Sequence, residues 1–413
     1  MNRTRLLALL LLVTAVFDVA AQSGRRLPPQ TTVEPAKAEA AFVPNPNREQ
    51  YQLISTKLSA AEKKEQRHAL SSWDRREHYA QAFSDDLTRV GLQGYRLVSI
   101  AFAPRLAVMK RSEHQYEYAI VEIANRQRRF PNDPKFELTF APWARNGFRV
   151  ADYFVAQDWC EMRADNPADR PSDLVVDCIY FSVIVLERQK DAAALPAQNH
   201  QIVHVEPTFN KNELGTGLTE ELKNARETNL YPTHLLTRFQ LLMQSPSDTD
   251  NATAGDFEIE VINGDVKKQI NELAQLGYRL LVRPHLFEAA IMHRKKGTTA
   301  ASSYLWIDEK QLEQQLPTLQ EEGAIYRMSY GCGNIWVSGT QMIFERPSDS
   351  DGLRRQYRVL AIELKDGSSS VQELEQVAKE GFEVRNFFAC RDGGKNKQPP
   401  SAKLLLERTV EDK

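Results

Sequence analysis

The chain has 413 residues, of which 42% are hydrophobic, and its 53 basic residues nearly balance 55 acidic ones. This apolar content is enough to bury more than one core, and the length predicts two to four domains. A net charge close to zero provides no strongly basic surface, so we expect neither nucleic acid nor an anionic membrane as the partner.

The first 21 residues have the three parts of a secretory signal peptide. Arg3 and Arg5 precede an apolar run from Leu6 to Phe17, and the small residues Val19–Ala21 follow as a cleavage site. The run is shorter than the ~20 residues that span a bilayer, so an uncleaved anchor is the less favoured alternative. We therefore expect an exported bacterial protein, periplasmic or extracellular, with no transmembrane segment after removal of residues 1–21.

Residues 22–48 are rich in proline and poor in large apolar side chains, which is typical of a flexible lead-in. The folded part is therefore predicted to begin at about residue 49, where a short strand near 51–55 is expected.

From there on, one spacing of apolar residues recurs six times. The apolar side chains stand eleven, seven and four residues before a Gly or Asn, and steps of four and three trace one face of a helix. The terminal Gly or Asn suits the position after a helix, where a left-handed backbone conformation is common. The six terminal residues are Gly94, Gly147, Asn229, Gly277, Gly323 and Gly381.

The copy around Gly277 shows most clearly what surrounds each helix. Phe257, Ile259 and Val261 alternate with acidic residues, which predicts a half-buried strand. A helix over about 265–276 follows, with Asp265 as its N-cap, and two strands of a hairpin come next at 278–282 and 288–293. The sequence therefore predicts an α+β fold of about six tandem strand-helix-strand-strand repeats, with small antiparallel sheets each backed by a helix.

One repeat of about fifty residues has only a marginal core, so neighbouring repeats are expected to pack in pairs. The predicted modules are residues 49–190, 200–296 and 302–410. The segments between them are rich in Ala, Gly, Thr or Ser, as linkers commonly are.

The segments that follow two of the helices resemble a family of short bacterial domains of unknown function. That family has a helix, then Gly-Trp-Glu-Leu-Val, then a strand that ends near Phe-Lys-Arg. The matching segments here are 94–98 with 109–111, 277–281 with 292–294 and, more loosely, 381–384 with 406–408; each copy departs at the Trp position. The resemblance implies a small sheet backed by a helix, in divergent tandem copies, and it implies no activity.

Four cysteines in an exported chain predict disulfide bonds. Cys160 and Cys178 belong to the two strands of one predicted hairpin, and Cys332 and Cys390 each stand nine residues after the glycine of adjacent repeats. The favoured pairing is therefore Cys160 with Cys178 and Cys332 with Cys390. Four reduced, buried thiols are the alternative.

An aromatic residue followed by Arg recurs at the start of the second predicted strand. Exposed side chains of these types would form a binding face, because they dominate the energetic centres of interfaces. The alternative is that each ring covers its helix while the Arg points to water. The eight residues are Tyr95, Arg96, Phe148, Arg149, Tyr278, Arg279, Tyr326 and Arg327.

No motif predicts catalysis, a metal or a cofactor. His200 and His204 have a spacing that seats a metal on a helix, but their surroundings predict a strand. The acidic loop that begins at Asp248 lacks the Gly and Glu that a calcium loop requires at its sixth and twelfth positions. Gly331-Cys332-Gly333 resembles a nucleophile turn, but no motif supplies a His.

Two functional hypotheses follow, and a purely structural envelope component is a third. The first is an exported non-enzymatic repeat protein that binds an unknown protein or polymer of the cell envelope. The second is an enzyme or small-ligand-binding protein with a site in a cleft between modules, where Trp143, Trp159 and Asp158 stand beside a long loop.

Overall fold

The protein is described from a computed structural model that mixes α and β structure and is dominated by strands. In the described residues, eighteen strands form six antiparallel sheets of three strands. The described ranges are 49–55, 72–101, 106–127, 134–163, 175–190, 200–204, 224–225, 227, 230–237, 240–245, 257–263, 265–285, 289–331, 340–348, 353–362, 368–389 and 402–411.

We number the sheets 1 to 6 in chain order. The first three consist of β1(Tyr51–Ser55), β2(Tyr95–Ala101) and β3(Leu106–Arg111); β4(Tyr116–Gln127), β5(Arg149–Arg163) and β6(Val175–Gln189); and β7(His200–His204), β8(Tyr231–Thr237) and β9(Gln240–Gln244). The last three consist of β10(Phe257–Asn263), β11(Arg279–His285) and β12(Ala289–Lys295); β13(Ser302–Asp308), β14(Ile325–Gly331) and β15(Thr340–Pro347); and β16(Leu353–Ile362), β17(Glu383–Ala389) and β18(Ala402–Glu411).

In every sheet the third strand lies in the middle, between the first and the second, and it is antiparallel to both. Five described helices each follow the first strand of a sheet and precede its second strand. They are α3(Ser72–Gly91), α4(Pro134–Arg145), α6(Val266–Gln275), α7(Glu309–Glu321) and α8(Ser368–Lys379).

Local sequence explains where α6 begins and ends. The side chain of Asp265 accepts a hydrogen bond from the backbone N–H of Lys268, which confirms the predicted N-cap. Gly277 ends the turn after the helix with φ +87°, and a Cβ there would lie 2.8 Å from the backbone oxygen of Thr298. The other predicted helix-ending glycines also have positive φ, whereas Asn229 lies outside the described residues.

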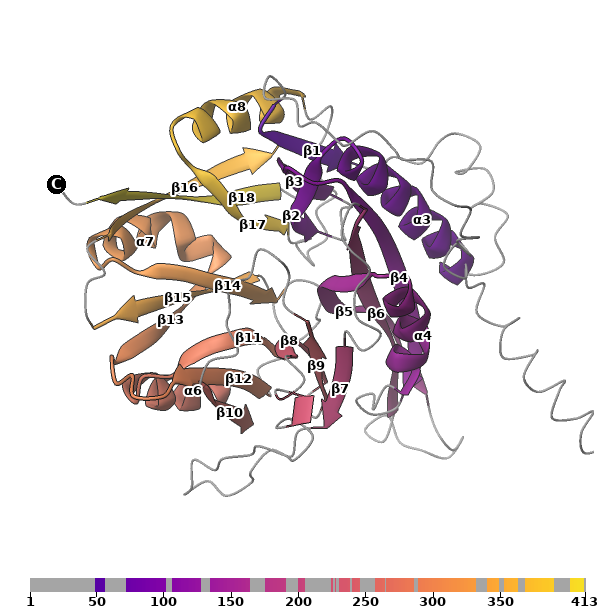
Figure 1. Ribbon diagram of the computed structural model, residues 1–413, viewed down its shortest axis with the longest axis horizontal. Coiled ribbons are helices and arrows are strands. Elements are labelled where there is room, and N and C mark those ends of the chain that lie inside the picture. Colours follow the sequence, from indigo (N-terminus) through magenta and orange to yellow (C-terminus); the bar gives the residue numbers. More distant parts are fainter. Residues whose placement is uncertain are drawn as a thin grey trace, which may run out of the picture.

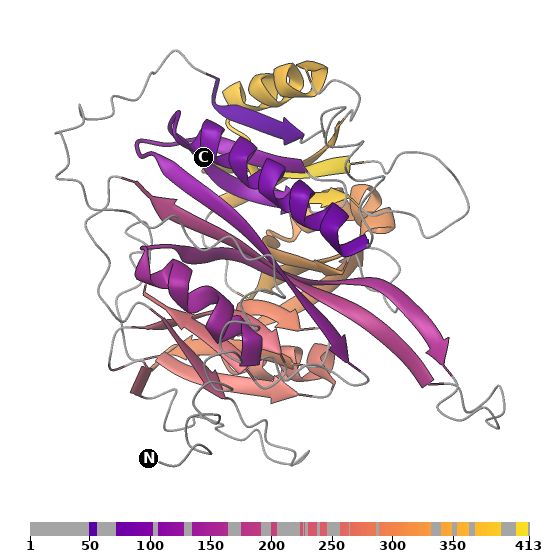
Figure 2. The same ribbon diagram turned by 90° about the vertical axis from the view of Figure 1, so that its right-hand side faces the viewer.

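Each sheet shares a buried hydrophobic cluster with the next sheet along the chain, and we call each such contact a joint. The six clusters form joints 1–2, 2–3, 3–4, 4–5, 5–6 and 6–1, so the sheets form a closed circuit in which the last contacts the first. Figure 1 shows this arrangement: α8 and the yellow strands lie beside the indigo β1, and α7 and α6 continue the circuit on the other side. In Figure 2 the long strands β5 and β6 project from it.

At five of the six joints, residues of a described helix belong to the shared cluster. At joint 4–5, Ile270 and Leu273 of α6 lie in one cluster with Met292 of their own sheet and with Tyr304 and Ile343 of the next. Joints 2–3 and 4–5, which lie between the predicted modules, have buried hydrophobic clusters, as the joints within the modules do. The division into three modules stays a prediction.

The strand near 51–55 and the elements around Gly277 are confirmed: β1, β10, α6, β11 and β12 lie where the sequence predicts them. The predicted signal peptide and lead-in lie outside the described residues. No described helix is both long and apolar enough to span a membrane.

Candidate functional site

Four tyrosines of first strands form hydrogen bonds across the joints. In each case the hydroxyl accepts a hydrogen bond from a backbone N–H in the second strand of the preceding sheet, over 2.8–3.3 Å. A β-bulge follows that donor residue, and a bulge leaves a backbone group free of the ladder. The pairs, hydroxyl first, are Tyr118 with Leu97, Tyr304 with Leu280, Tyr357 with Tyr326 and Tyr51 with Val384.

The backbone N–H groups of the same four tyrosines are also bonded across the joints. Each donates to a side chain on the helix of the preceding sheet, over 2.6–2.9 Å. The acceptors are Thr88 for Tyr118, Asn271 for Tyr304, Gln320 for Tyr357 and Glu375 for Tyr51. The first strand is an edge strand, so these bonds satisfy a donor that would otherwise be open to pairing with another chain.

Sheet 3 lacks this tyrosine, and a glutamine takes over its role at joint 2–3. The side chain of Gln244 is buried; its Oε1 accepts from the N–H of Val150 at 2.7 Å, and its Nε2 donates to the carbonyl of Val150 at 3.2 Å. Val150 again precedes a bulge. The same backbone position is therefore satisfied by a different side chain.

Three of the tyrosines stand opposite a buried glutamate in their own sheet. Glu187, Glu345 and Glu407 are the register partners of Tyr118, Tyr304 and Tyr357, and each glutamate is at most 5% exposed. Buried carboxylates require cationic partners, because removing the charge from water costs several kcal/mol. The partners are Arg96 for Glu187, Arg279 and Arg327 for Glu345, and Arg355 and Arg385 for Glu407.

The richest of these clusters lies at joint 4–5. Glu345 accepts from Arg279 of sheet 4 and from Arg327 of sheet 5, the latter at 2.6 Å. Tyr304 donates to the same carboxylate at 3.4 Å, and burial raises the pKa of its hydroxyl far above neutrality. The pKa of His293 is lowered. Burial is the first cause, and the nearby charges of Arg327 and Arg279 follow.

The contacts of these groups favour a structural role over proton transfer. Two guanidinium groups engage the carboxylate of Glu345, the hydroxyl of Tyr304 is kept protonated, and the imidazole of His293 is favoured in its neutral form. At Tyr357 and Glu407 burial comes first among the causes that raise both pKa values, so both groups are shifted toward their protonated forms.

An arginine near the end of the third strand has a separate role in three of the sheets. Its guanidinium stacks on the aromatic ring that follows the helix-ending glycine, with 4.4–4.7 Å between the guanidinium carbon and the ring centroid. It also donates to a carbonyl at the end of the helix, at 2.8–2.9 Å. The three sets are Arg188 with Phe148 and Asn146, Arg294 with Tyr278 and Leu276, and Arg408 with Phe382 and Glu380.

The rings of the predicted binding face lie largely in the interior. Tyr95, Phe148 and Tyr278 are buried, and Tyr326 is half-buried. Tyr326 stands three residues after Gly323, whereas Tyr95 directly follows Gly94; it is the residue before the bulge of its strand, the position that Leu97 has in β2.

The structure brings two of the predicted arginines together and separates the others. Arg279 and Arg327 share Glu345, whereas Arg96 bonds Glu187 at joint 1–2, and Arg149 lies at the start of β5 with its Nε buried. The side chains of Arg96, Arg279 and Arg327 remain partly exposed, so a role of this face in binding stays a prediction.

Of the four cysteines, two can be placed in the fold. Cys160 and Cys178 are register partners across β5 and β6, as the predicted pairing requires of the backbone. Cys332 and Cys390 lie outside the described residues, so both disulfides stay predictions. His200 and His204 are the two ends of β7. Within the described ranges, no three His, Cys, Asp or Glu residues gather as a metal site would require.

The family resemblance pointed to the arginines that end segments 292–294 and 406–408 but not to their contacts, and sequence reasoning missed the four tyrosines. A Tyr in the strand that follows each hairpin was the available signal, but its distance from the preceding helix-ending glycine varies, with 24 residues from Gly94 to Tyr118 and 27 from Gly277 to Tyr304. No family model, no curated protein and no solved structure matches this chain.

Proposed function

We propose that the six sheets are copies of one strand-helix-strand-strand unit, and that the protein is an exported, non-enzymatic binding module of the cell envelope. The single order of strands in all six sheets supports the first part. The glycine after each of the five described helices and the recurring tyrosine support it as well. The signal-like residues 1–21 support export.

One topological observation carries the binding proposal. The third strand is antiparallel to both neighbours, so the hairpin between second and third strands and the connection from first strand to helix leave the same end of each sheet. We call this the hairpin end. The hairpin connections there differ widely in length. The connection between β8 and β9 is residues 238–239, whereas the connection between β17 and β18 is residues 390–401. A constant core with loops of varied length at one end is how repeat proteins commonly present binding surfaces.

The experiment is a capture with matched loop variants. The mature protein, residues 22–413, is immobilised without reductant and exposed to envelope extract of its host. One variant replaces 164–174 and 391–401 at the hairpin end with Gly-Ser chains of equal length. The control variant replaces 191–199, which connects two sheets at the opposite end.

We expect one or two enriched proteins or polymers that wild type and control retain and that the hairpin variant loses. Equal capture by both variants, or no capture at all, would contradict the proposal. An empty capture together with a rise in Tm on addition of a metal or metabolite would instead support the small-ligand alternative.

A further inference from the structure

The second strands of neighbouring sheets meet on the inner side of the circuit. β17 contacts β2, β14 contacts β17, and β11 contacts β14, and these four strands lie along the inner side in Figure 1. Hydrogen bonds also join them: Asn386 Nδ2 donates to Ser329 Oγ at 2.8 Å, and the N–H of Phe387 donates to Ser99 Oγ at 2.9 Å. Side chains from different sheets are therefore brought together here.

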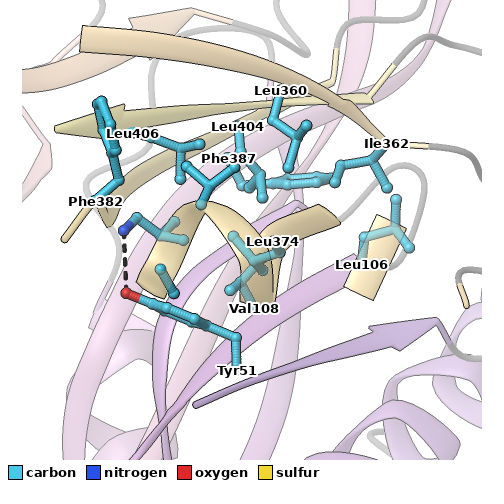
Figure 3. Close-up of a cluster of buried hydrophobic side chains, with 13 residues drawn as sticks. Tyr51, Leu106, Val108, Leu360, Ile362, Leu374, Phe382, Phe387, Leu404 and Leu406 are labelled. Carbon is cyan, nitrogen blue, oxygen red and sulfur yellow. Dashed lines mark hydrogen bonds between the residues drawn. The ribbon is translucent and has the colours of Figure 1, made fainter. Parts of the chain in front are cut away.

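The first β-bulge of each second strand skips one residue in the register, and we call it the bulge residue. At joint 5–6 the hydroxyl of Tyr357 bonds the backbone N–H just before the bulge residue Arg327. At joint 6–1 the hydroxyl of Tyr51 bonds the N–H of Val384, as Figure 3 shows, and the bulge residue Arg385 follows. The tyrosine bonds thus fix the backbone from which both arginines project.

The bulge residue is an arginine in sheets 5 and 6 and an uncharged residue in the other four sheets. Positions that all units share serve the common core of a repeat protein, so a departure in two adjacent units indicates a local role. The uncharged bulge residues are Val98, Ala151, Thr233 and Leu281.

At joint 4–5 the arginines exceed what a buried glutamate requires. Within the described ranges, Glu187 at joint 1–2 pairs with one arginine, Arg96. One guanidinium can therefore accompany a buried carboxylate in this fold. Glu345 has two: Arg279, in the strand position of Arg96, and the bulge residue Arg327.

Joint 5–6 shows the same excess. Glu407 lies 3.3 Å from the bulge residue Arg385 and 3.8 Å from Arg355. Glu383 also lies 3.8 Å from Arg385, but it is only 2.7 Å from Lys110 and balances that lysine. Over joints 4–5 and 5–6, four arginines accompany two buried glutamates, which leaves two positive charges in excess.

The excess charge is accessible from solvent. The side chains of Arg327 and Arg385 are 36% and 42% exposed, whereas Glu345 and Glu407 are buried. The glutamate pairs use Nε and Nη2 of Arg327 and Nε and Nη1 of Arg385, so one Nη of each guanidinium stands outside these pairs. A guanidinium is a planar fork of five N–H donors that matches carboxylate and phosphate oxygens.

The two bulge arginines also lie close to the same carboxylate. Burial raises the pKa of Glu407, and the charges of Arg385, Arg355 and Arg327 oppose this increase. Arg327 therefore stands between Glu345, which it bonds, and Glu407, whose charge it feels. Because the buried glutamates hold the guanidinium groups in place, a ligand would have to order few side chains on binding.

We propose that Arg327 and Arg385, together with Arg279, form an oxyanion site on the inner strands of sheets 4 to 6 that binds a dianionic ligand through phosphate or carboxylate oxygens. The two excess positive charges match the two charges of the ligand. Both bulge arginines are third in seven-residue strands, nearer to the helix than to the hairpin end. The site is thus separate from the hairpin end, and either proposal can fail without the other.

Isothermal titration of the mature protein with inorganic phosphate and with succinate, at pH 7.5 and constant ionic strength, tests the site. The double variant Arg327→Gln with Arg385→Gln leaves each buried glutamate with one arginine, as Glu187 has in the wild type. Arg358→Gln is the control, because Arg358 is 49% exposed and pairs with Glu380 on the first strand of sheet 6 and its helix.

We expect wild type and control to bind at least one probe with one site per chain. The double variant should bind it at least about tenfold more weakly, because two hydrogen bonds between charged groups are lost. The probe that binds more tightly identifies the ligand group as phosphate or carboxylate.

Equal affinity of wild type and double variant would overturn the proposal, and so would the failure of both probes to bind the wild type. Circular dichroism shows whether the double variant is folded. If it is not, Arg385→Gln decides alone, because Glu407 keeps Arg355 in that variant. An affinity unchanged by Arg385→Gln would then overturn the proposal.

Discussion

Joints 3–4 and 4–5 lie on the two faces of the same sheet and are built differently. At joint 4–5 the polar groups of Tyr304, Glu345 and Arg279 accompany the apolar cluster. At joint 3–4 the cluster consists of apolar residues of both sheets together with Ala225 and Leu230. Ile259 stands opposite His293 there, the register position that corresponds to Tyr304 opposite Glu345.

Among the described residues, sheets 3 and 4 thus share an apolar cluster without the tyrosine and glutamate that joint 4–5 adds. The tyrosine and the glutamate add directional contacts. The tyrosine hydroxyl bonds one backbone N–H and the glutamate bonds two guanidinium groups, and together these bonds admit only one register between the sheets. A buried ion pair is weak evidence for net stability, whereas removal of one partner is costly. The two joints should therefore respond differently to substitution.

The largest effect is expected at Glu345. Glu345→Ala leaves Arg279 and Arg327 without their shared carboxylate, so we expect the free energy of unfolding to fall by about 3–5 kcal/mol. Denaturant unfolding of the mature protein measures it. Glu322→Ala is the control, because its pair with Arg346 is about one-third exposed and should contribute at most ~1 kcal/mol. Equal effects of the two variants would show that Glu345 does not hold the joint.

Joint 3–4 should break through its apolar contacts instead. Ile291 is fully buried in that cluster, and Ile291→Ala should cost about 2–4 kcal/mol through lost burial and a cavity. The same denaturation assay applies, and Leu276→Ala is the matched control, because Leu276 is 48% exposed. A cost below that of the control would mean that joint 3–4 relies on contacts other than its apolar cluster.

A smaller effect is expected when only the hydroxyl is removed. Tyr304→Phe keeps the ring but leaves the N–H of Leu280 without its acceptor, which should cost about 1–2 kcal/mol. Tyr357→Phe at joint 5–6 should cost a similar amount, and the two changes should add, because they act at different joints. Strong non-additivity in the double variant would indicate that the joints are coupled.

The smallest effect concerns Glu260, a buried glutamate of sheet 4. Burial raises the pKa of Glu260 to about 7, and a hydrogen bond with Tyr278 partly opposes this increase. Because the folded-state pKa is raised, stability is complete below the unfolded value near 4.5 and declines as the pH rises through 7. Glu260→Gln should flatten the stability profile between pH 5 and 8 and stabilise the protein by about 1 kcal/mol at pH 8. An unchanged slope would contradict this assignment.

Much of the fold could be predicted from local patterns. The alternation of Phe257, Ile259 and Val261 and the glycine after each helix report directly on burial and backbone conformation, and both are properties of neighbouring residues. The order of strands in the sheets also follows, because a hairpin preceded by a strand and a helix leaves few ways to pair.

The joints could not be predicted in this way. Tyr304 reads as an ordinary strand residue, and its role depends on a bulge in a strand that lies more than twenty positions earlier. Tyr326-Arg327 resembles Tyr95-Arg96 in letters but follows its glycine two residues later, so the repeated pair of residues does not occupy a repeated position. The contact of Tyr51 with Val384 joins segments 333 positions apart, which no local pattern reports.

The closed circuit also constrains how such a chain can change in length. An open array of stacked units can gain or lose a unit at either end, because its end units contact only one neighbour. Here sheet 1 packs on sheet 6, so neither end is free. Deleting or duplicating one unit would have to alter the angle at every joint at once. Insertions and deletions should therefore accumulate in the loops of homologous chains, while the number of sheets stays the same.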